Sequence, residues 1–532
     1  MAAMAVLTGC GGDKKETAAA PAEGNTTAAV TEAAKTEAET TAAVQTEAGG
    51  EKNLVMPSAS CVANLNPLLE GYKEAAMLNP IYDPLYVIDV NETRYYLADS
   101  YEVSEDGMQI TVKLKEGLKW HDGEAITADD MIFTMDVCSD TNNGAGGTNI
   151  VILNDQPVKY EKVDDLTVKV TLPMASASYA DLLGGLTLIP EHVFEGNPSV
   201  VSAGEANMKG IGSGPYKVTE FKQDEYLLLE KYEDYYMGAP SIDKVTFRII
   251  SDLSAQEVAL MNGEVNFMEL ANAPAVAKYE ADPNFTVVKY PEGRVNYLAV
   301  NKFCETVQDP KVVEAVFAAL NRDEIIAGAY GDGMAESANS IFSNVNTFYD
   351  PSVEGYTQDV EKAKQLVKET GLDSKTLTLY FNSERVYMKE SAQIIQQQLK
   401  NVGINLEVIP LESAGFFEKV FGTDGDYEFY LNGYGAVGDP DQVVAGMYDG
   451  TWGVNLAVSD EVSQLWKDAR TVYTPEERAA IYKQIQIQTR DELTCYPIAY
   501  PNYVFVTTSN IKGADTIKRT PVFEDYTKLT ME

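Results

Sequence analysis

Hydrophobic and polar residues alternate along several short stretches of the chain, and these stretches predict β-strands. Apolar side chains stand at every second position at Ile110, Val112 and Leu114, which is the spacing of a strand with one buried face. The stretch "KVDDLTVKVTLP" repeats this pattern. The longer stretch "IGSGPYKVTEFKQDEYLLLEKYEDYYMGAPSIDKVTFRII" predicts a hairpin followed by a further strand.

Other stretches carry the start and stop signals of helices. The residues expected to cap or stop helices are Thr127 with Asp130, Ser254 with Glu257, Asp309 before Pro310, Asn321, Gly371 and Gly403. Strand, helix and strand follow one another in "KVTFRIISDLSAQEVALMNGEVNFMEL", and again from "TLTLYFN" to "INLEVIPL". This order predicts two α/β lobes, with a more β-rich domain ahead of them.

Length and charge narrow the class of protein. A chain of 532 residues is long enough for roughly three domains. The formal net charge of -40 argues against a nucleic-acid partner, because affinity for phosphate backbones comes largely from Lys and Arg. No run of about 20 apolar residues is present, so no segment is predicted to span a bilayer.

The residues that usually carry catalysis or bind metals are sparse. The five cysteines show no CxxC spacing, and His121 and His192 are the only histidines. We therefore expect no metal site, no cofactor and no histidine-based catalysis, and we assign both histidines a structural role. The disulfide state of Cys61, Cys138, Cys304 and Cys495 stays open.

The N-terminal stretch resembles that of a bacterial lipoprotein. Leu7-Thr8-Gly9-Cys10 is similar to a lipobox, in which the cysteine becomes the first, lipid-carrying residue. The segment behind it is a low-complexity mixture of Ala, Thr, Glu and Gly, which predicts a flexible tether. The alternative is an incidental cysteine near a frayed end. No Lys or Arg precedes the apolar residues, so we expect the natural N-terminus to be longer.

A series of motifs in the body resembles one protein family. The stretches are "YLADSYEVSEDGMQITVKLKEGLKWHDGEAITADDMIFT", "LIPEHVF", "MNGEVNF", "LAVNKF", "QDPKVVEAVFAALNRDEII" and "VGINLEVIPL". Together with the hairpin stretch, they resemble in content and order the extracellular solute-binding proteins of ABC importers, family 5, the peptide and nickel group.

The resemblance implies an α/β, bilobed periplasmic-binding-protein-like fold, with a smaller domain inserted in the first lobe. Ligand would be trapped between the lobes by hinge closure. We expect a signal remnant with the lipobox at 1–10, the tether at 11–52, lobe I at 53–82, the inserted domain at 83–185, lobe I again at 186–295, lobe II at 296–495 and a return to lobe I at 496–532.

The same resemblance implies residues for a ligand site. Arg385 stands in an Arg-x-Tyr context where an arginine of peptide-binding relatives can hold a ligand carboxylate through a bidentate pair. The alternative is a surface arginine paired with a neighbouring Glu. Three residues before Asp439-Pro440, where dipeptide and oligopeptide binders carry an Asp for the peptide ammonium, this chain has Ala436. Ordinary recognition of a peptide ammonium is therefore not expected.

Further candidates come from the stretches that line the ligand in relatives. They are Tyr72, Glu74 and Ala75 in "LEGYKEAAMLNP", then Tyr434 and Gly435 beside Ala436, and finally Trp452. Large aromatic side chains with a polar atom suit peptides and sugars alike. Ordinary core packing is the alternative for Tyr434 and Trp452.

We therefore predict a monomeric, lipid-anchored receptor on the extracytoplasmic face of the membrane, with no catalytic residue. It would capture a peptide or peptide-like solute and deliver it to an ABC permease and ATPase complex. An oligosaccharide or another small solute is the first alternative ligand. The remaining alternatives are a surface glycan hydrolase and an adhesin or sensor on the same fold.

Overall fold

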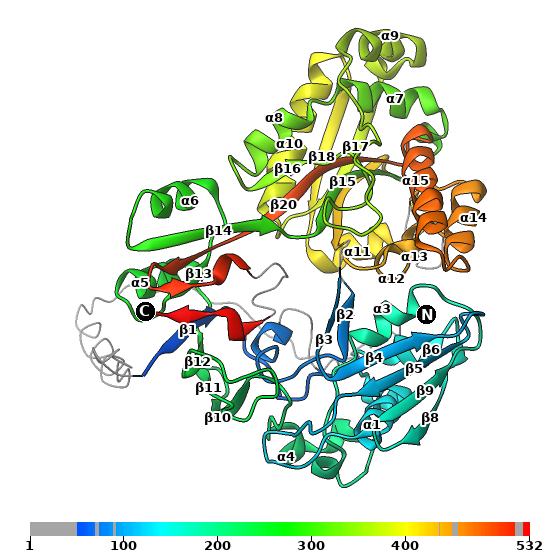
Figure 1. Cartoon of the computed structure of the whole chain (residues 1–532). Helices are drawn as coiled ribbons and strands as arrows, with labels where there is room; N and C mark the ends of the chain where they lie inside the picture. Colours follow the sequence, from blue (N-terminus) through cyan, green and yellow to red (C-terminus); the bar gives the residue numbers. More distant parts are fainter. Residues whose placement is uncertain (1–50, 70–73, 89–91, 436, 450–455, 517–524) are drawn as a thin grey trace, which may run out of the picture. The chain divides into compact units, whose positions relative to one another are not determined.

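The computed structural model describes residues 51–69, 74–88, 92–435, 437–449, 456–516 and 525–532 (Figure 1). These residues form mixed α and β structure, as the alternating patterns predict. Cys10 and nearly all of the expected tether lie outside them. None of the described helices combines the length and the apolar character needed to cross a bilayer.

An antiparallel four-stranded sheet lies within the expected inserted domain. Its strands, in spatial order, are β4 (Ala98–Val103), β5 (Gln109–Leu114), β9 (Thr167–Thr171) and β8 (Lys159–Asp164). Ile110, Val112 and Leu114 of β5 are buried, which confirms the predicted alternation. The hydrophobic core around this sheet continues past the expected boundary at 185 as far as Val200.

The helix that covers this core begins where the sequence predicts. α1 (Ala128–Ser139) has Thr127 as its N-cap, and the capping box with Asp130 is present. The hydroxyl of Thr127 and the carboxylate of Asp130 thus satisfy backbone N–H groups that the first turn leaves without helical partners. Short elements complete this region: α2 (Thr148–Val151), α3 (Tyr179–Gly184), β2 (Tyr86–Ile88), β3 (Thr93–Tyr95), β6 (Ile152–Leu153) and β7 (Gln156–Pro157).

A second four-stranded sheet contains the start of the described chain. Its order is β1 (Asn53–Ser58), β12 (Lys244–Ile249), β11 (Tyr226–Lys231) and β10 (Tyr216–Lys222). β10, β11 and β12 pair antiparallel, so the predicted hairpin and following strand are confirmed. β1 pairs parallel with β12, and thereby joins two segments that are far apart in sequence.

The largest sheet has eight strands. Its main order is β13 (Phe267–Glu269), β20 (Cys495–Thr508), β15 (Arg294–Val300), β19 (Phe429–Gly435), β17 (Thr376–Asn382) and β18 (Asn405–Leu411), and both β14 (Phe285–Pro291) and β16 (Ala335–Ser337) pair with β20. The second predicted strand–helix–strand unit is confirmed, because β17 and β18 pair parallel across α10 (Val386–Asn401).

β20 links two parts of this sheet. Its first residues, 495–501, pair with β15 and β16, while residues 502–508 pair with β14 and β13. The expected boundary between lobe II and the return to lobe I falls at the start of this strand. One continuous backbone therefore passes from one part to the other (Figure 1).

The first predicted strand–helix–strand unit differs from the expectation in two ways. α5 (Leu253–Met261) is capped by Asp252, whose Oδ1 accepts a hydrogen bond from the amide of Ala255 at 2.8 Å. The prediction that Ser254 is the cap was wrong, because Asp252 takes the capping position two residues earlier. The flanking strands β12 and β13 also belong to separate sheets.

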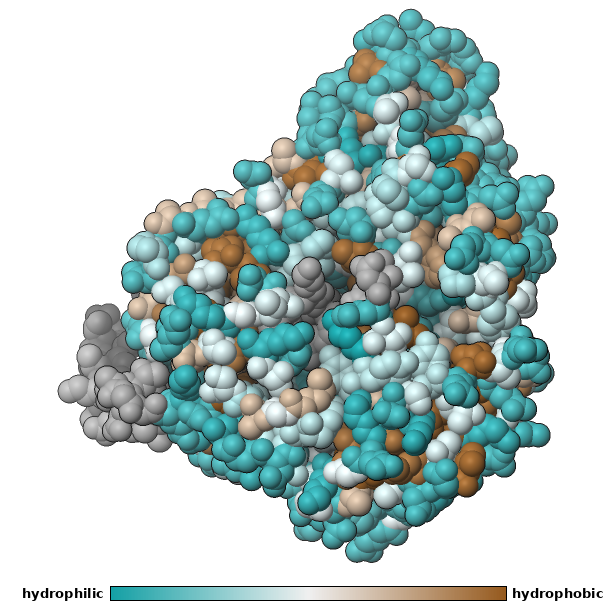
Figure 2. Space-filling view, in the orientation of Figure 1, coloured by the Kyte–Doolittle hydropathy of each residue, from teal (hydrophilic) through white to brown (hydrophobic). Residues whose placement is uncertain are grey.

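The remaining helices are α4 (Gly204–Asn207), α6 (Ala273–Glu280), α7 (Pro310–Ala319), α8 (Arg322–Ala329), α9 (Val360–Thr370), α11 (Ser413–Val420), α12 (Pro440–Val443), α13 (Ala445–Tyr448), α14 (Asp460–Ala469) and α15 (Pro475–Asp491). Asp309 and Asn321 cap α7 and α8, and Gly371 ends α9, as predicted. The face drawn in Figure 2 is largely hydrophilic, in keeping with a chain that is 23% charged.

Candidate ligand-binding site

Arg385 lies between the end of strand β17 and the start of helix α10. It is the N-cap residue of α10, three residues after the end of β17. Its side chain is half-buried, and Nη1 donates to the hydroxyl of Tyr387 at 3.2 Å. Tyr387 stacks on Tyr330, with 5.4 Å between the ring centroids, and Asn296 Nδ2 donates to the Tyr330 hydroxyl at 2.8 Å. The arginine is thus held by an ordered aromatic pair.

The alternative role for Arg385, a surface pair with a neighbouring glutamate, is not what the described residues form. Glu384 instead accepts a hydrogen bond from the Ser413 hydroxyl at 2.7 Å. In the part of the chain that the structure describes, no carboxylate lies within ion-pair distance of Arg385. Its guanidinium therefore keeps donors for another group.

A second arginine, which the sequence reasoning missed, lies close by. Arg294 begins β15, and its Nη2 donates to the carbonyl oxygen of Gly433 at 2.8 Å. Glu292 precedes it and is only partly exposed. Burial raises the pKa of the Glu292 carboxyl, while the positive charges of Arg294 and Arg385 act in the opposite direction. The charges of both arginines therefore act on the Glu292 carboxyl.

Gly435 leaves open space beside Arg294. The two residues are paired across β15 and β19, so their side-chain positions lie on the same face of the sheet. No atom of the described residues lies within 4 Å of the point where a Cβ of residue 435 would stand. At Gly433, by contrast, a Cβ would lie 2.0 Å from Asn296 Oδ1. The strand is therefore closely packed at Gly433 and open at Gly435.

Tyr434 lies between these two glycines, so its side chain is on the other face of β19. Its hydroxyl donates to the carbonyl oxygen of Ile341 at 2.6 Å and lies 3.1 Å from the hydroxyl of Tyr448. Its ring packs 5.1 Å from that of Tyr297. These contacts favour the core-packing alternative for Tyr434.

The remaining predicted site residues are Tyr72, Glu74, Ala75, Ala436 and Trp452. Glu74 and Ala75 begin the 3₁₀ helix Glu74–Met77. Tyr72, Ala436 and Trp452 lie outside the described residues, as does Cys10.

The acidic residues that follow Ala436 are engaged elsewhere. Asp439 is the N-cap of α12 and forms a bidentate pair with Arg478, in which Nη2 lies 3.0 Å from Oδ1. Asp441 pairs with Arg470 at 2.6 Å. Both carboxylates are nearly buried, so neither is placed to replace the missing Asp at position 436.

The same acidic segment contacts the region of α3. Ser178 donates to Asp441 Oδ2 at 2.8 Å and accepts a hydrogen bond from Gln442 Nε2 at 2.6 Å. The backbone amide of Asp439 donates to Asp181 Oδ2 at 3.0 Å. We call this set the α3–α12 contact. It joins the expected inserted domain to the expected lobe II.

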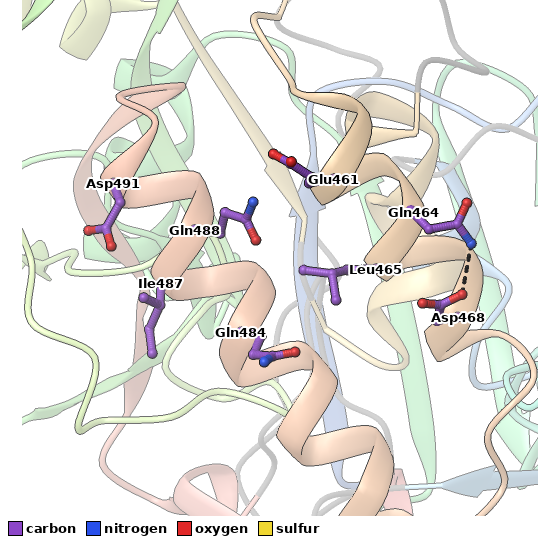
Figure 3. Close-up of a pocket in the computed structure, with 8 residues that line it drawn as sticks. All are labelled: Glu461, Gln464, Leu465, Asp468, Gln484, Ile487, Gln488 and Asp491. Carbon is purple, nitrogen blue, oxygen red and sulfur yellow. Dashed lines mark hydrogen bonds between the residues drawn. The ribbon is translucent and has the colours of Figure 1, made fainter.

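One pocket among the described residues lies away from the predicted site residues. It is a groove between α14 and α15 (Figure 3), with a volume of about 580 Å³. Its lining residues are Glu461, Gln464, Leu465, Asp468, Gln484, Ile487, Gln488 and Asp491. None of them belongs to the Arg385 region, and the side chains drawn come only from the two helices.

The histidines are placed as the structural interpretation expects. His121 Nε2 lies 2.9 Å from the carbonyl oxygen of Gly214, and its Nδ1 accepts a hydrogen bond from the Gly212 amide. Burial lowers the pKa of His121 to about 4, so it is neutral at pH 7. Among the described residues, no group of three His, Cys, Asp or Glu side chains could hold a metal ion.

Comparison with known proteins identifies the family. The model of the bacterial extracellular solute-binding proteins, family 5, matches residues 92–455, which is more than half of the chain. The chain belongs to this family. The predicted resemblance and fold class are therefore confirmed, and the family name implies an extracellular solute receptor.

Individual relatives match nearly the whole chain. The dipeptide-binding protein of Escherichia coli K12 is 27% identical over 87% of this chain and 92% of its own length. The ABC transporter substrate-binding protein CtaP from Listeria monocytogenes is 33% identical, covers 90% of this chain and 99% of its own, and superposes with a TM-score of 0.84. For AppA from Clostridium difficile these values are 34%, 91%, 100% and 0.82.

Proposed function

We propose that this family-5 protein captures a peptide or peptide-like solute through the free carboxylate of that ligand, and delivers it to an ABC permease after closure of its two lobes. The half-buried guanidinium of Arg385, which Tyr387 holds at the start of α10, carries this proposal. The peptide class is supported by the dipeptide-binding relative.

Each residue has a role in the proposed binding step. Arg385 forms a bidentate pair with the ligand carboxylate, since guanidinium and carboxylate match in geometry. Arg385 stands at the N-terminus of the 16-residue helix α10, so the positive end of the helix dipole also attracts the ligand carboxylate. Tyr387 orients the guanidinium through its hydroxyl. Binding breaks and forms no covalent bond in the ligand, so in this proposal the protein is a receptor and has no catalytic residue.

Ala436 bears on whether the ligand needs a free ammonium group. Without a carboxylate at that position, a ligand ammonium lacks a charged partner there, and Asp439 and Asp441 are already paired with arginines. Acetylation of the peptide N-terminus is therefore expected to change affinity little, whereas amidation of the C-terminus abolishes the main charged contact.

We further propose four features on the family resemblance alone. Cys10 carries the lipid and residues 11–52 tether the monomeric receptor to the extracytoplasmic face of the membrane. Tyr72, Glu74, Ala75 and Trp452 line the ligand, and the domain boundaries follow the family pattern. Tethering raises the effective concentration of receptor at its permease.

A thermal-shift screen tests the ligand class. The full chain is mixed with di- to hexapeptides that have free or blocked termini, and with oligosaccharides. A ligand at about 100 times its Kd stabilises the fold by roughly 2.7 kcal/mol. We expect stabilisation by peptides with a free carboxylate and a loss of affinity of at least roughly tenfold in Arg385→Ala.

Arg248→Ala is the matched control, because Arg248 is a half-exposed arginine that pairs with Glu264 at 3.2 Å. Stabilisation by oligosaccharides alone would replace the peptide proposal by the first alternative. If amidated peptides bind as tightly as peptides with a free carboxylate, Arg385 does not hold a ligand carboxylate.

Mass spectrometry tests the anchor separately. Protein from the membrane fraction is expected to carry acyl chains on Cys10, and Cys10→Ser is expected to appear in the culture medium. An unmodified Cys10 in the membrane fraction contradicts the anchor without affecting the ligand proposal.

A further inference from the structure

Arg385 is the last member of a series of side-chain contacts that begins in the large sheet. Its Nη1 donates to the Tyr387 hydroxyl at 3.2 Å. The ring of Tyr387 stacks on the ring of Tyr330, with 5.4 Å between the centroids and 28° between the ring planes. The Tyr330 hydroxyl in turn accepts a hydrogen bond from Asn296 Nδ2 at 2.8 Å. The contacts therefore run from β15, through the residue that follows α8, to the start of α10.

The two helices next to these tyrosines pack closely against each other. A Cβ at Gly328 of α8 would lie 2.5 Å from Ile394 Cδ1 of α10. Two residues further along the chain, Tyr330 meets Tyr387 in the first turn of α10, so the two helices run in opposite directions. Since side chains in such close packing have little room to move, the place of the Tyr330 ring fixes the place of the Tyr387 ring.

Asn296 stands in the sheet at a cost to stability. Its exposed fraction is 3%, and its Oδ1 has no hydrogen-bond partner among the described residues. The same oxygen packs against Gly433, where a Cβ would lie 2.0 Å from it. A buried amide oxygen without a partner destabilises a fold, so an apolar side chain would suit this position better. The hydrogen bond from Nδ2 to Tyr330 is therefore the contact that calls for an asparagine here.

We propose that Asn296 and Tyr330 are positioning residues for the carboxylate anchor Arg385. This inference rests on the proposed function. Asn296 fixes the ring of Tyr330, and this ring fixes Tyr387, whose hydroxyl holds the guanidinium. Neither Asn296 nor Tyr330 needs to touch the ligand. A bidentate pair requires the guanidinium plane to face the carboxylate, and an arginine that is already oriented loses less conformational entropy when the ligand binds.

The test is equilibrium dialysis of the full chain against a random tripeptide library with free carboxyl termini, and against the same library amidated. Mass spectrometry quantifies the retained peptides, and the readout is the ratio of free-carboxyl to amidated peptide. We expect Tyr330→Leu, which removes the stacked ring, to lower this ratio roughly fivefold. Tyr330→Phe keeps the ring and Asn296→Ala removes only the hydrogen bond to it, so each is expected to lower the ratio roughly twofold.

Tyr349→Leu is the matched control. Tyr349 is also a half-buried tyrosine, its hydroxyl donates to Asn339 Oδ1 at 2.9 Å, and its ring packs edge-on against Tyr500. Its removal is expected to leave the ratio unchanged. A merely structural role of Tyr330 would lower retention of both libraries alike. In the Arg385→Ala background, Tyr330→Leu is expected to cause no further change in the ratio, because Tyr330 acts only through Arg385.

The outcomes separate this inference from the proposed function. If wild type retains both libraries equally, the proposed function fails and this inference fails with it. If wild type prefers free-carboxyl peptides and Arg385→Ala loses the preference, but folded Tyr330→Leu keeps the wild-type ratio, only this inference is overturned. Circular dichroism of each variant checks folding. If Tyr330→Leu does not fold, an unchanged ratio in both Tyr330→Phe and Asn296→Ala overturns the inference instead.

Discussion

Asp83 is a buried carboxyl that the proposed binding function does not use. Its exposed fraction is 5%, and its Oδ2 accepts hydrogen bonds from the hydroxyls of Tyr235 and Tyr236, both at 2.8 Å. The Ser213 hydroxyl accepts a hydrogen bond from the Asp83 amide. Burial raises the pKa of Asp83 from 3.8 to about 7, although both tyrosine hydroxyls favour the charged form. Desolvation is therefore the stronger effect here.

This raised pKa predicts a pH dependence of stability. Because the folded carboxyl binds its proton more tightly than the unfolded one, its contribution is complete below pH of about 4 and is lost as the pH rises through about 7. The full difference is on the order of 4 kcal/mol. We expect Asp83→Asn to remove this dependence, as measured by urea unfolding at pH 5 and pH 8.

The control for Asp83 is Asp234→Asn, an exposed carboxylate that adjoins the same tyrosines in sequence. It is expected to follow the wild-type pH dependence. Parallel curves for wild type and Asp83→Asn would show that Asp83 does not titrate in this range.

At the level of single elements, β19 predicts opposite effects for two neighbouring glycines. A Cβ at residue 433 would collide with Asn296 Oδ1, whereas a Cβ at residue 435 meets no described atom within 4 Å. We expect Gly433→Ala to lower the free energy of unfolding by about 1–3 kcal/mol. Gly435→Ala is expected to change it by less than about 0.5 kcal/mol.

For ligand affinity, we expect substitution of Gly435 to have a larger effect than substitution of Gly433. Gly435→Val places a branched side chain beside Arg294 and should weaken binding of free-carboxyl peptides without unfolding the protein. Denaturant titration and calorimetry separate the two effects. Normal affinity in folded Gly435→Val would exclude the space above Gly435 from the ligand site.

Element starts were predictable from sequence wherever the signal is local. Thr127, Asp309 and Asn321 cap their helices through atoms only two or three residues away. Ser254 failed because Asp252 offers a competing cap within the same few residues, and a carboxylate caps as well as a hydroxyl. Arg294 and Glu292 carried no local signal, since the effect of Arg294 and Arg385 on the Glu292 carboxyl depends on the tertiary fold.

At the scale of the whole molecule, the α3–α12 contact connects segments more than 250 residues apart in sequence. Ion pairs hold Asp441 in this contact: Arg470 pairs with Asp441 at 2.6 Å and with Asp449 at 2.5 Å. The Ala177 amide also donates to the Arg470 carbonyl oxygen at 2.9 Å. The sequence resemblance predicted lobes that close on a ligand, but no local pattern identified which side chains would meet.

Removing this contact should weaken ligand binding, if closure holds the ligand between the expected domains. Ser178→Ala and Asp181→Ala each remove hydrogen-bond partners of α12, and each bond contributes about 0.5–1.5 kcal/mol. We expect the double variant to bind free-carboxyl peptides roughly fivefold or more weakly, with a larger radius of gyration by small-angle X-ray scattering. Ser202→Ala, an exposed serine that donates to Ser199, is the control. A double variant with wild-type affinity and an unchanged radius of gyration would mean that closure does not depend on the α3–α12 contact. The stabilisation of the closed form would then have to come from the ligand and from β20.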